Sequence, residues 1–410
     1  MALHMRSDWV VCFLVLLFFI QLAAGAENAS ENTTDLSSQS YQGMIHLFRP
    51  ESDSIPSTQV NDMINGLHGE VLMATPLGLS TYDGSWSTLH IDENNVSEGL
   101  MDNFVTALDY DPSGNLWIGF AGGIQIYNGH YFRVINDQQL LKSLQIRDIQ
   151  RWNDEMWVAT GNAALQRYRN GTWTWFAPFS PGGPGFFEAD SMALDSATDT
   201  LLVATAHEGL WEVIPSNGTT VRFDKIADKN DLFGLLGHVR RDPLGGAYFF
   251  NATQVAHYDS TTGFTTLLTS DDFYGGPCAI NDVTGGSDGA LYVATDNGIY
   301  VWENGVITRH LGAFEGVGTS SHRVRTVFAD AGNRLWFSTA DNVGYFSMNL
   351  STTPLITIET VTPTTPPAPV PGNISPVATP TAIPPPAATS PLDQILAFLS
   401  RFVPFLHPSR

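Results

Sequence analysis

The chain has 410 residues, of which 43% are hydrophobic and only 15% are charged. Its formal net charge of −22 at pH 7 repels phosphate backbones, so we expect no nucleic acid among its partners. Gly, Trp, Tyr and Phe are plentiful, which favours a β-rich structure with many tight turns over a helical bundle.

Residues 1–26 have the features of a secretory signal peptide. Arg6 is followed by an apolar run from Trp9 to Ala24, and Ala24-Gly25-Ala26 fits a small-residue cleavage site. The run of roughly 15 residues is short for a membrane span, which needs about 20, although an uncleaved anchor is the alternative. We therefore predict export, with a flexible segment over residues 27–42 before the folded domain.

The cysteines and the glycosylation sequons add to the prediction of export. Cys12 lies in the signal, so Cys278 has no partner for an internal disulfide, and we expect it to be buried and unreactive. Asn-x-Ser/Thr sequons are weak signals singly, but together they predict a glycosylated surface protein if the organism has the machinery. The candidate glycosylation sites are Asn28, Asn32, Asn95, Asn170, Asn217, Asn251, Asn349 and Asn373.

One strand pattern recurs about every 44 residues along the chain. Each copy reads apolar, aromatic or Leu, apolar, small, and then often Thr or Ser. We call these copies the anchor strands. Their second residues are Leu72, Trp117, Trp157, Leu202, Tyr248, Tyr292 and Trp336. A period of this length that is built only from strands is typical of propeller blades.

Each repeat predicts four strands, as the second one illustrates. An inner strand over residues 105–110 leads through the turn at 111–115 to the anchor strand. Pro presets φ at the second position of such a turn and Gly supplies a positive φ, so these are hairpin turns. A third strand over 123–127 then precedes Asn128-Gly129, a strong hairpin signal, and a fourth strand.

The two ends of the repeat region complement each other. The seventh repeat ends near Met348 after three strands, and residues 43–48 form a lone strand before the first repeat. If this strand pairs with the last blade, the ring closes and no sheet edge is exposed. The sequence therefore predicts an all-β fold, a seven-bladed β-propeller over residues 43–349 closed by an N-terminal strand.

The second repeat also resembles a known family. Its residues Asn103-Phe104-Val105, Asp111-Pro112-Ser113-Gly114-Asn115-Leu116-Trp117-Ile118-Gly119 and Gly122-Gly123 are similar to the two-component-regulator propeller repeat. This resemblance implies a periplasmic or extracellular sensor region, which in that family often precedes a membrane span and a histidine kinase. Neither follows the propeller here, so we do not expect direct signalling by this chain.

The C-terminal part is low in complexity. Residues 350–389 are rich in Pro, Thr and Ala, which predicts a disordered, polyproline-like stalk. Residues 390–410 favour a short amphipathic helix that Ser390 caps and Pro404 ends. With about 13 residues it is too short to span a bilayer. One expectation is that this helix contacts a membrane surface or a partner through residues 391–403. The alternative is that it folds back onto the propeller or is only marginally structured.

Residues just before each inner strand of a propeller gather at one mouth of its channel, which makes them the candidate ligand-binding site. The alternative is that they are solvated or bond to neighbouring backbone. We expect no cofactor and no catalytic residue. We also expect no metal site, because Asp109-x-Asp111-x-Ser113-x-Asn115 fits a hairpin turn better than a calcium loop. The candidates are Asn61, Asp62, Asn103, Arg147, Asp148, Asp190, His238, Asn281, His322 and Arg323.

Three functions remain open at this point. The favoured one is a sensor-like module outside the cell, without its own kinase output, that binds an unknown extracellular ligand or surface protein. The second is a secreted hydrolase or lyase that uses His207-Glu208, or His310 with Glu315, as an acid–base pair on the channel face. The third is a structural surface glycoprotein.

Overall fold

The computed structural model describes residues 45–92, 98–205, 207–216, 220–228, 237–318 and 321–348. The predicted signal peptide, the segment over 27–42, the stalk and the terminal helix lie outside these ranges, as do the sequons at Asn28, Asn32, Asn95, Asn217, Asn349 and Asn373. Within the described part, no helix has the length and apolar character that a bilayer crossing requires.

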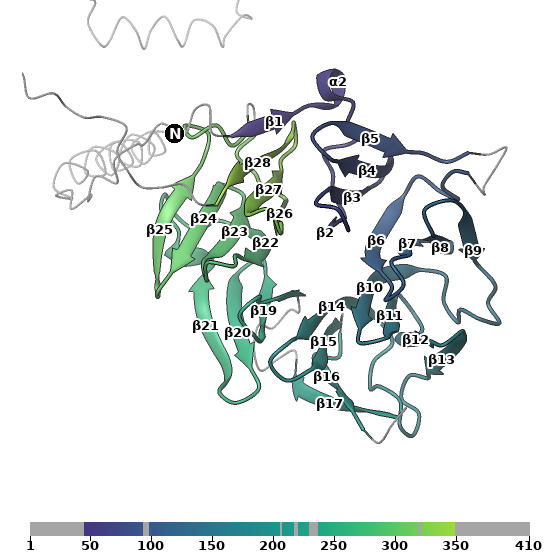
Figure 1. The fold of residues 1–410 in the computed structure, drawn as a ribbon. Helices are drawn as coiled ribbons and strands as arrows, with labels where there is room; N and C mark the ends of the chain where they lie inside the picture. The colour runs from purple at the N-terminus through teal and green to yellow at the C-terminus, as the bar shows by residue number, and fades with distance from the viewer. Residues whose placement is uncertain are drawn as a thin grey trace, which may run out of the picture. The chain divides into compact units, whose positions relative to one another are not determined.

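Seven four-stranded antiparallel sheets surround a central axis, which confirms the predicted seven-bladed propeller (Figure 1). The short helices α2 (Pro50–Asp53) and η1 (Ser270–Asp272) lie between strands. The first four blades are β2 (Asp62–Asn65), β3 (Val71–Thr75), β4 (Gly78–Tyr82) and β5 (Trp86–Leu89); β6 (Val105–Tyr110), β7 (Leu116–Phe120), β8 (Gly123–Tyr127) and β9 (Phe132–Ile135); β10 (Ile146–Trp152), β11 (Glu155–Thr160), β12 (Leu165–Arg169) and β13 (Thr172–Phe176); and β14 (Ala189–Asp195), β15 (Thr200–Thr205), β16 (Leu210–Pro215) and β17 (Val221–Ala227).

The seventh blade differs from the others because its outermost strand comes from the start of the chain. The fifth and sixth blades are β18 (His238–Arg241), β19 (Ala247–Asn251), β20 (Gln254–Asp259) and β21 (Gly263–Thr269); and β22 (Ile280–Gly285), β23 (Leu291–Thr295), β24 (Gly298–Glu303) and β25 (Val306–Leu311). The seventh is β26 (Thr326–Ala329), β27 (Arg334–Ser338), β28 (Val343–Ser347) and β1 (His46–Phe48).

Strand β1 closes the ring as the sequence predicts. It pairs antiparallel with β28, with His46 opposite Tyr345 and Phe48 opposite Val343. The ring of Phe48 also packs against Trp86 of the first blade, at 5.3 Å between ring centroids, and against Tyr345, at 6.0 Å. The closing strand therefore contributes side-chain contacts to two blades in addition to its hydrogen bonds.

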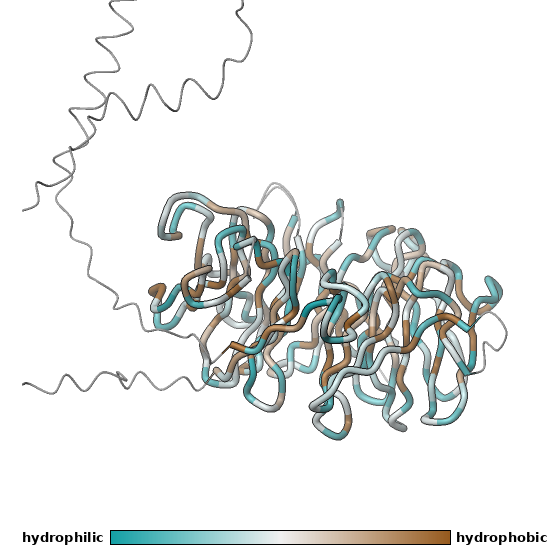
Figure 2. Tube along the Cα trace, turned by 90° about the horizontal axis from the view of Figure 1, so that it is seen from above, coloured by the Kyte–Doolittle hydropathy of each residue, from teal (hydrophilic) through white to brown (hydrophobic). Residues whose placement is uncertain are grey.

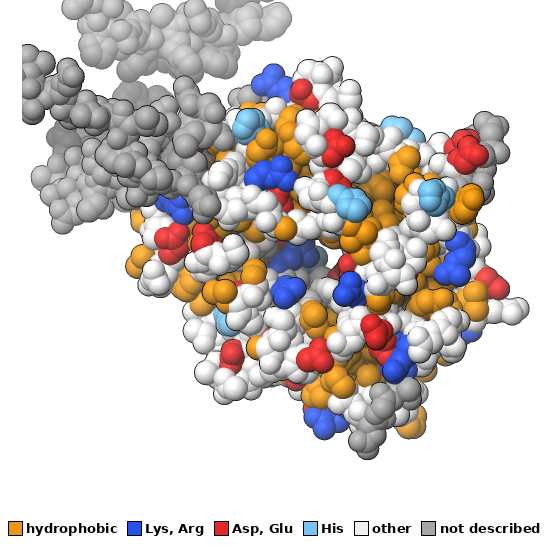
Figure 3. Space-filling model, viewed as in Figure 1, with side chains coloured by type: hydrophobic (Ala, Val, Ile, Leu, Met, Phe, Trp, Pro, Cys, Tyr) orange, Lys and Arg blue, Asp and Glu red, His pale blue; other side chains and the backbone are white. Residues whose placement is uncertain are grey.

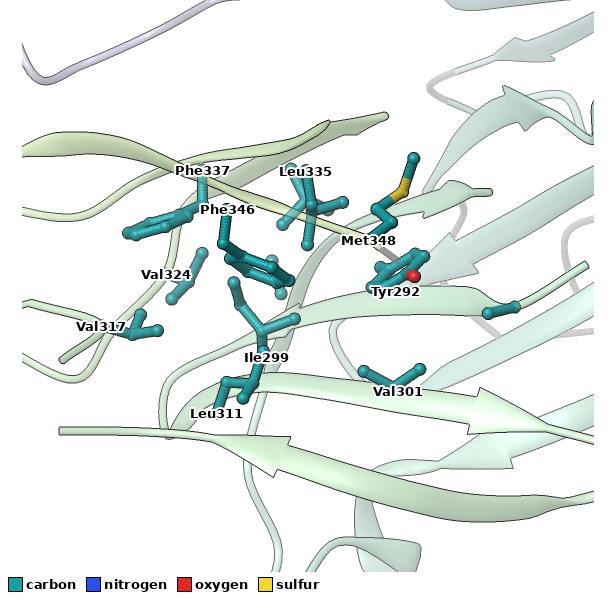
Figure 4. Close-up of a cluster of buried hydrophobic side chains, with 13 residues drawn as sticks. Tyr292, Ile299, Val301, Leu311, Val317, Val324, Leu335, Phe337, Phe346 and Met348 are labelled. Atoms are coloured by element: carbon teal, nitrogen blue, oxygen red, sulfur yellow. The ribbon is translucent and has the colours of Figure 1, made fainter. Parts of the chain in front are cut away.

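The hydrophobic core lies between neighbouring blades. Every residue of the anchor strands β3, β7, β15 and β23 is buried, because a second sheet packs on each of their faces. Figure 4 shows one such cluster, in which side chains of the sixth blade such as Ile299 meet Phe337 and Phe346 of the seventh. Seen from the side, hydrophobic residues follow the strands of the ring, and many loops are hydrophilic (Figure 2).

An acidic residue before the anchor strand bonds to an anchor aromatic in several blades. Trp117 Nε1 donates to Asp111 Oδ2 at 3.2 Å, and Trp336 Nε1 donates to Asp330 Oδ2 at 2.8 Å. Asp111 also accepts hydrogen bonds from Asn115 and from the Ser113 amide, so its oxygens serve the hairpin turn. The predicted turn at residues 111–115 is confirmed.

Two sequence expectations concern single surface positions. Cys278 was expected to be buried, but it is only partly buried, at the edge of the cluster between the fifth and sixth blades. Burial nevertheless raises the pKa of its thiol. The sequon residue Asn170 is exposed in the turn between β12 and β13, whereas Asn251 uses its side-chain oxygen to accept the Thr253 and Gln254 amides.

Candidate functional site

Four of the inner strands, β6, β10, β14 and β22, share an irregularity near the residue at which they begin. In the third blade, Ile146 pairs with Thr160 and Asp148 with Ala159, which leaves Arg147 as an extra residue in a β-bulge. The same shift occurs at Thr106, Asp190 and Asn281. A bulge takes one residue out of the ladder and re-aims its side chain, and bulges are frequent beside functional sites.

The first and seventh blades place a residue at the same position just before the strand. The Asn61 amide donates to the carbonyl of Ala74, the residue that faces Asp62, and the Arg325 amide donates to the carbonyl of Ser338. We call the six residues at this position the entrance layer: Asn61, Thr106, Arg147, Asp190, Asn281 and Arg325. In the fifth blade the position is Gly237, where a Cβ atom would collide with the Phe250 carbonyl.

The entrance layer lines a cavity of about 580 Å³, which we call the entrance cavity. The wall beside the entrance layer also includes Phe104, Gln145 and His238. Four further lining residues lie deeper in the channel: Asp62, Asp148, Arg240 and Asp282. Figure 3 shows a hollow at the centre of one face of the ring, with basic side chains beside it. The volume is within the range of small-molecule sites, roughly 300–1,000 Å³.

Most of the predicted site residues line this cavity. They are Asn61, Asp62, Arg147, Asp148, Asp190, His238 and Asn281. The other three do not line it. Asn103 accepts the Ile91 amide at 2.7 Å, Arg323 is paired with Asp296 at 2.9 Å, and His322 is exposed. A ligand-binding role for the ten residues stays a prediction.

Several residues of the cavity wall are not among the predicted site residues. Thr106 and Arg325 lie eleven positions before the anchor residues Trp117 and Trp336, the same offset at which Asn61 precedes Leu72. Counting back from the anchors would therefore have found them, whereas choosing the nearest conspicuous polar residue led to Asn103 and Arg323. Arg240, Asp282 and Gln145 were also missed.

Three carboxylates and one guanidinium lie deep in the channel, at a level that we call the waist: Asp62, Asp148, Asp282 and Arg240. All four also line a second cavity of about 530 Å³ toward the opposite face, so the waist lies between the two cavities. Arg240 Nε bonds to Asp282 Oδ1 at 3.1 Å. When every group is ionised, the waist carries two more negative than positive charges.

Each waist carboxylate also links two blades. Asp62 Oδ2 accepts the Leu108 amide of the next inner strand at 2.8 Å. In the same way, Asp148 Oδ2 accepts the Met192 amide at 2.6 Å and Asp282 Oδ2 accepts the Val327 amide at 3.2 Å. Because bonds to ionised acceptors are stronger than neutral ones, these links stabilise the ring from its inside.

Burial raises the pKa of two waist carboxyls, Asp62 and Asp148, above the ordinary value. Burial, followed by the charge of Asp148, raises the pKa of Asp62 to about 7, although Arg240 opposes the shift. Burial likewise raises the pKa of Asp148 to about 6 and that of nearby Asp109 to about 6. Channel solvent still reaches the waist, since 38% of the Arg240 side chain is exposed. Asp62 and Asp148 therefore exchange protons close to neutral pH.

The entrance layer has a different charge balance from the waist. Arg147 and Arg325 are exposed, and neither guanidinium has a hydrogen bond or ion pair with another described side chain. Asp190 lies near Arg147 and His238, which oppose the rise in its pKa that burial causes. Burial, followed by the charge of Arg240, lowers the pKa of His238. Two arginines are thus available to an incoming anionic group.

Two acid–base pairs were considered for an enzyme, and neither lines the cavities of the channel. His207 of the first pair, His207-Glu208, is exposed and near enough to Asp190 for its charge to oppose the rise in the pKa of that carboxyl. The second pair is His310 with Glu315. His310 belongs to β25, the outermost strand of the sixth blade, and its Nε2 bonds to the Asn297 carbonyl at 2.6 Å. Glu315 accepts the Gly312 amide at 2.7 Å. Among the described residues, no group of three or more His, Cys, Asp or Glu side chains is placed to hold a metal ion.

The fold and its polar channel define the class of protein as a seven-bladed β-propeller. Within this class, residues 99–122 match the family model described as two component regulator propeller, so the second blade is a repeat of that type. The match spans the first two strands of that blade, β6 and β7, and ends before β8. Comparison with curated proteins gives no match.

Solved structures resemble the whole ring. The extracellular domain of the proposed one component system BT4673 from B. thetaiotaomicron matches with a TM-score of 0.60 and 19% identity, over 75% of this chain and 40% of that one. The extracellular domain of the hybrid two component system BT3049 from the same organism gives 0.58 and 15%, over 75% and 41%. A streptogramin B lyase gives 0.56 and 14%, over 73% and 96%. At these identities the likeness establishes the fold, and the chain spans about two fifths of the two extracellular domains from B. thetaiotaomicron.

Proposed function

We propose that this chain is an extracytoplasmic, sensor-like binding module that takes a small polar ligand in the entrance cavity. The observation that carries the proposal is the entrance layer, in which six blades each place a residue at one cavity, four of them from a bulge and two from the position just before the strand. A rigid ring that presents adaptable side chains at its mouth is suited to recognition. The likeness to extracellular sensor domains supports the same function.

The binding test uses the exported chain and a panel of small polar compounds: amino acids, dicarboxylates, polyamines and sugars. We expect at least one class to raise the midpoint of thermal unfolding, because a ligand that binds only the folded state stabilises it. Calorimetric titration then gives the affinity for wild type and for Arg147→Ala and Arg325→Ala. Loss of a hydrogen bond to a charged group costs about 1.5–3 kcal/mol, a weakening of roughly 10- to 100-fold.

Arg133→Ala is the matched control, since Arg133 is an exposed arginine on the outermost strand of the second blade. It should bind as wild type does. Absence of a shift with every class of compound, or equal affinity in wild type and the two cavity variants, would overturn the proposed function.

The location proposed for the module has its own test. Intact cells that express the full chain are treated with a membrane-impermeant amine-reactive biotin reagent. An extracytoplasmic propeller should be labelled on its lysines, such as Lys142 and Lys225, without cell lysis. Labelling that requires lysis, alongside a cytoplasmic marker protein, would place the chain inside the cell and contradict the proposal.

A further inference from the structure

The charges of the channel are separated by depth. In three blades a residue of the entrance layer directly precedes a waist carboxylate: Asn61 before Asp62, Arg147 before Asp148 and Asn281 before Asp282. Waist residues line both cavities, whereas the side chains of Arg147, Asp190 and Arg325 line only the entrance cavity. A ligand in the entrance cavity therefore meets arginines at its outer end and an excess of carboxylates at its inner end.

The inner end of the entrance cavity has unused hydrogen-bond acceptors among the described residues. Asp62 uses Oδ2 for the Leu108 amide, and its Oδ1 accepts no hydrogen bond from the rest of the described chain. The only waist cation, Arg240, is bonded to Asp282. An ionised carboxylate has about four lone-pair sites, so Asp62 and Asp148 retain capacity for a donor. An ammonium group supplies three donors and the positive charge that the waist lacks.

The outer end of the entrance cavity has unused hydrogen-bond donors among the described residues. The amides of Asn61 and Asn281 are occupied, since their Nδ2 atoms donate to the carbonyls of Val105 and Val324. Arg147 and Arg325 have no such partner in the described part of the chain. A guanidinium matches the two oxygens of a carboxylate, which makes these arginines suited to an acidic group.

Resting on the proposed function, we propose that the ligand is a small zwitterion, a free amino acid or short peptide. Its ammonium group binds Asp62 and Asp148 at the waist, and its carboxylate binds Arg147 and Arg325 in the entrance layer. A purely anionic ligand is repelled by the waist, and a purely cationic ligand is opposed by the arginines. A zwitterion satisfies both ends, and a cavity of about 580 Å³ has room for a short peptide.

The test pairs each end of the ligand with the residues that hold it. Three probes are titrated at pH 8 into the full exported chain: 6-aminohexanoate with a panel of amino acids and dipeptides, their N-acetyl derivatives, and their C-terminal amides. We expect the zwitterions to bind and either derivative to bind at least 10-fold more weakly. Asp62→Asn should weaken zwitterion binding without changing that of the N-acetyl derivative, and Arg147→Ala with Arg325→Ala should spare the amide.

Asp148→Asn provides a second waist variant, so that poor folding of one variant does not decide the result; circular dichroism checks each fold. Asp154→Asn and Arg133→Ala are controls on the outer surface. If sugars or dicarboxylates bind with the same dependence on Arg147, the zwitterion assignment is overturned while the proposed function stands. If no probe of any class binds, or if binding ignores every cavity substitution, both fall.

Discussion

Asp62 illustrates how one residue couples folding to protonation. It faces Asp148 from β10, Asp109 from β6 and Arg240 from β18, and its pKa is raised to about 7. The folded state thus keeps a proton that the unfolded chain, with an ordinary carboxyl, releases near pH 4. A group of this kind stabilises the fold relatively at low pH, and this contribution is lost as the pH rises through the folded pKa.

From this we predict that Asp62→Asn stabilises the propeller at pH 8 and has little effect at pH 5. The amide keeps an acceptor for Leu108 and removes the repulsion with Asp148. The thermal midpoint should rise by roughly 2–4 °C for each kcal/mol gained. Scanning calorimetry at both pH values measures it, with Asp154→Asn on the exposed turn before β11 as control. A larger gain at pH 5 than at pH 8 would contradict the prediction.

The site residues show where sequence reasoning succeeds at this scale. Asn61, Arg147 and Asn281 could be predicted because they lie at the beginning of an inner strand or directly before it. Thr106 was missed because a hydroxyl is less conspicuous than the amide of Asn103. Arg240 was missed because its role depends on neighbours in other blades, such as Asp282, which no local pattern reveals.

At the scale of elements, acidic residues before the anchor strands join the hairpin turn to the anchor strand by hydrogen bonds. Asp330 is buried and accepts hydrogen bonds from Trp336 Nε1, from the Arg334 amide and from Arg334 Nε at 2.6 Å. Arg334 in turn lies over the ring of Trp336, 5.3 Å from its centroid. The turn and the anchor strand are therefore held together by one carboxylate.

Asp330→Ala should destabilise the propeller by about 2–4 kcal/mol, because it leaves the buried Trp336 N–H and the Arg334 charge without their acceptor. Chemical unfolding followed by tryptophan fluorescence measures the change. Asp330→Asn should lose less, since it keeps one acceptor oxygen. Asp154→Ala, at an exposed turn position, serves as the neutral control. An equal loss of unfolding free energy in both alanine variants would contradict the stabilising role of the Asp330 hydrogen bonds.

The closing strand is the other element with a measurable contribution. Phe48 contacts rings of Tyr82, Trp86, Trp336 and Tyr345. Because Phe48 is only partly buried, Phe48→Ala should cost less than a core Phe, about 2 kcal/mol. Thermal unfolding should shift down by roughly 4–8 °C. Leu244→Ala, at a side chain that is 69% exposed, should leave the midpoint unchanged.

At the scale of the whole molecule, the ring depends on one non-local pairing. The first and last strands meet although almost the entire propeller separates them in sequence, with His46 opposite Tyr345. The repeat period made the blade count predictable, and the three-plus-one tally of strands predicted this closure. The bulges could not be predicted, because they depend on hydrogen-bond register, which the apolar pattern of a strand does not specify.

A cysteine pair at the closure tests the ring directly. His46→Cys combined with Tyr345→Cys should form a disulfide across the pair and restrict a loop of roughly 300 residues, a stabilisation of up to about 5 kcal/mol. Loss of the stacked rings of His46 and Tyr345 offsets about 1 kcal/mol of it. Thermal unfolding with and without a reductant measures the gain, and each single variant is the control. Two thiols that stay free under oxidising conditions would contradict the closure.

The bulges have a consequence for how such a ring can diversify. Residues such as Thr106, Arg147 and Asp190 are supernumerary in the ladder, so their side chains are not chosen by cross-strand pairing. Exchanging them alters the chemistry of the pore while the cores between blades are left untouched. The residues that face a ligand and the residues that hold the blades together are therefore different positions of the same strands. The fold can acquire a new specificity through a few substitutions at the bulges.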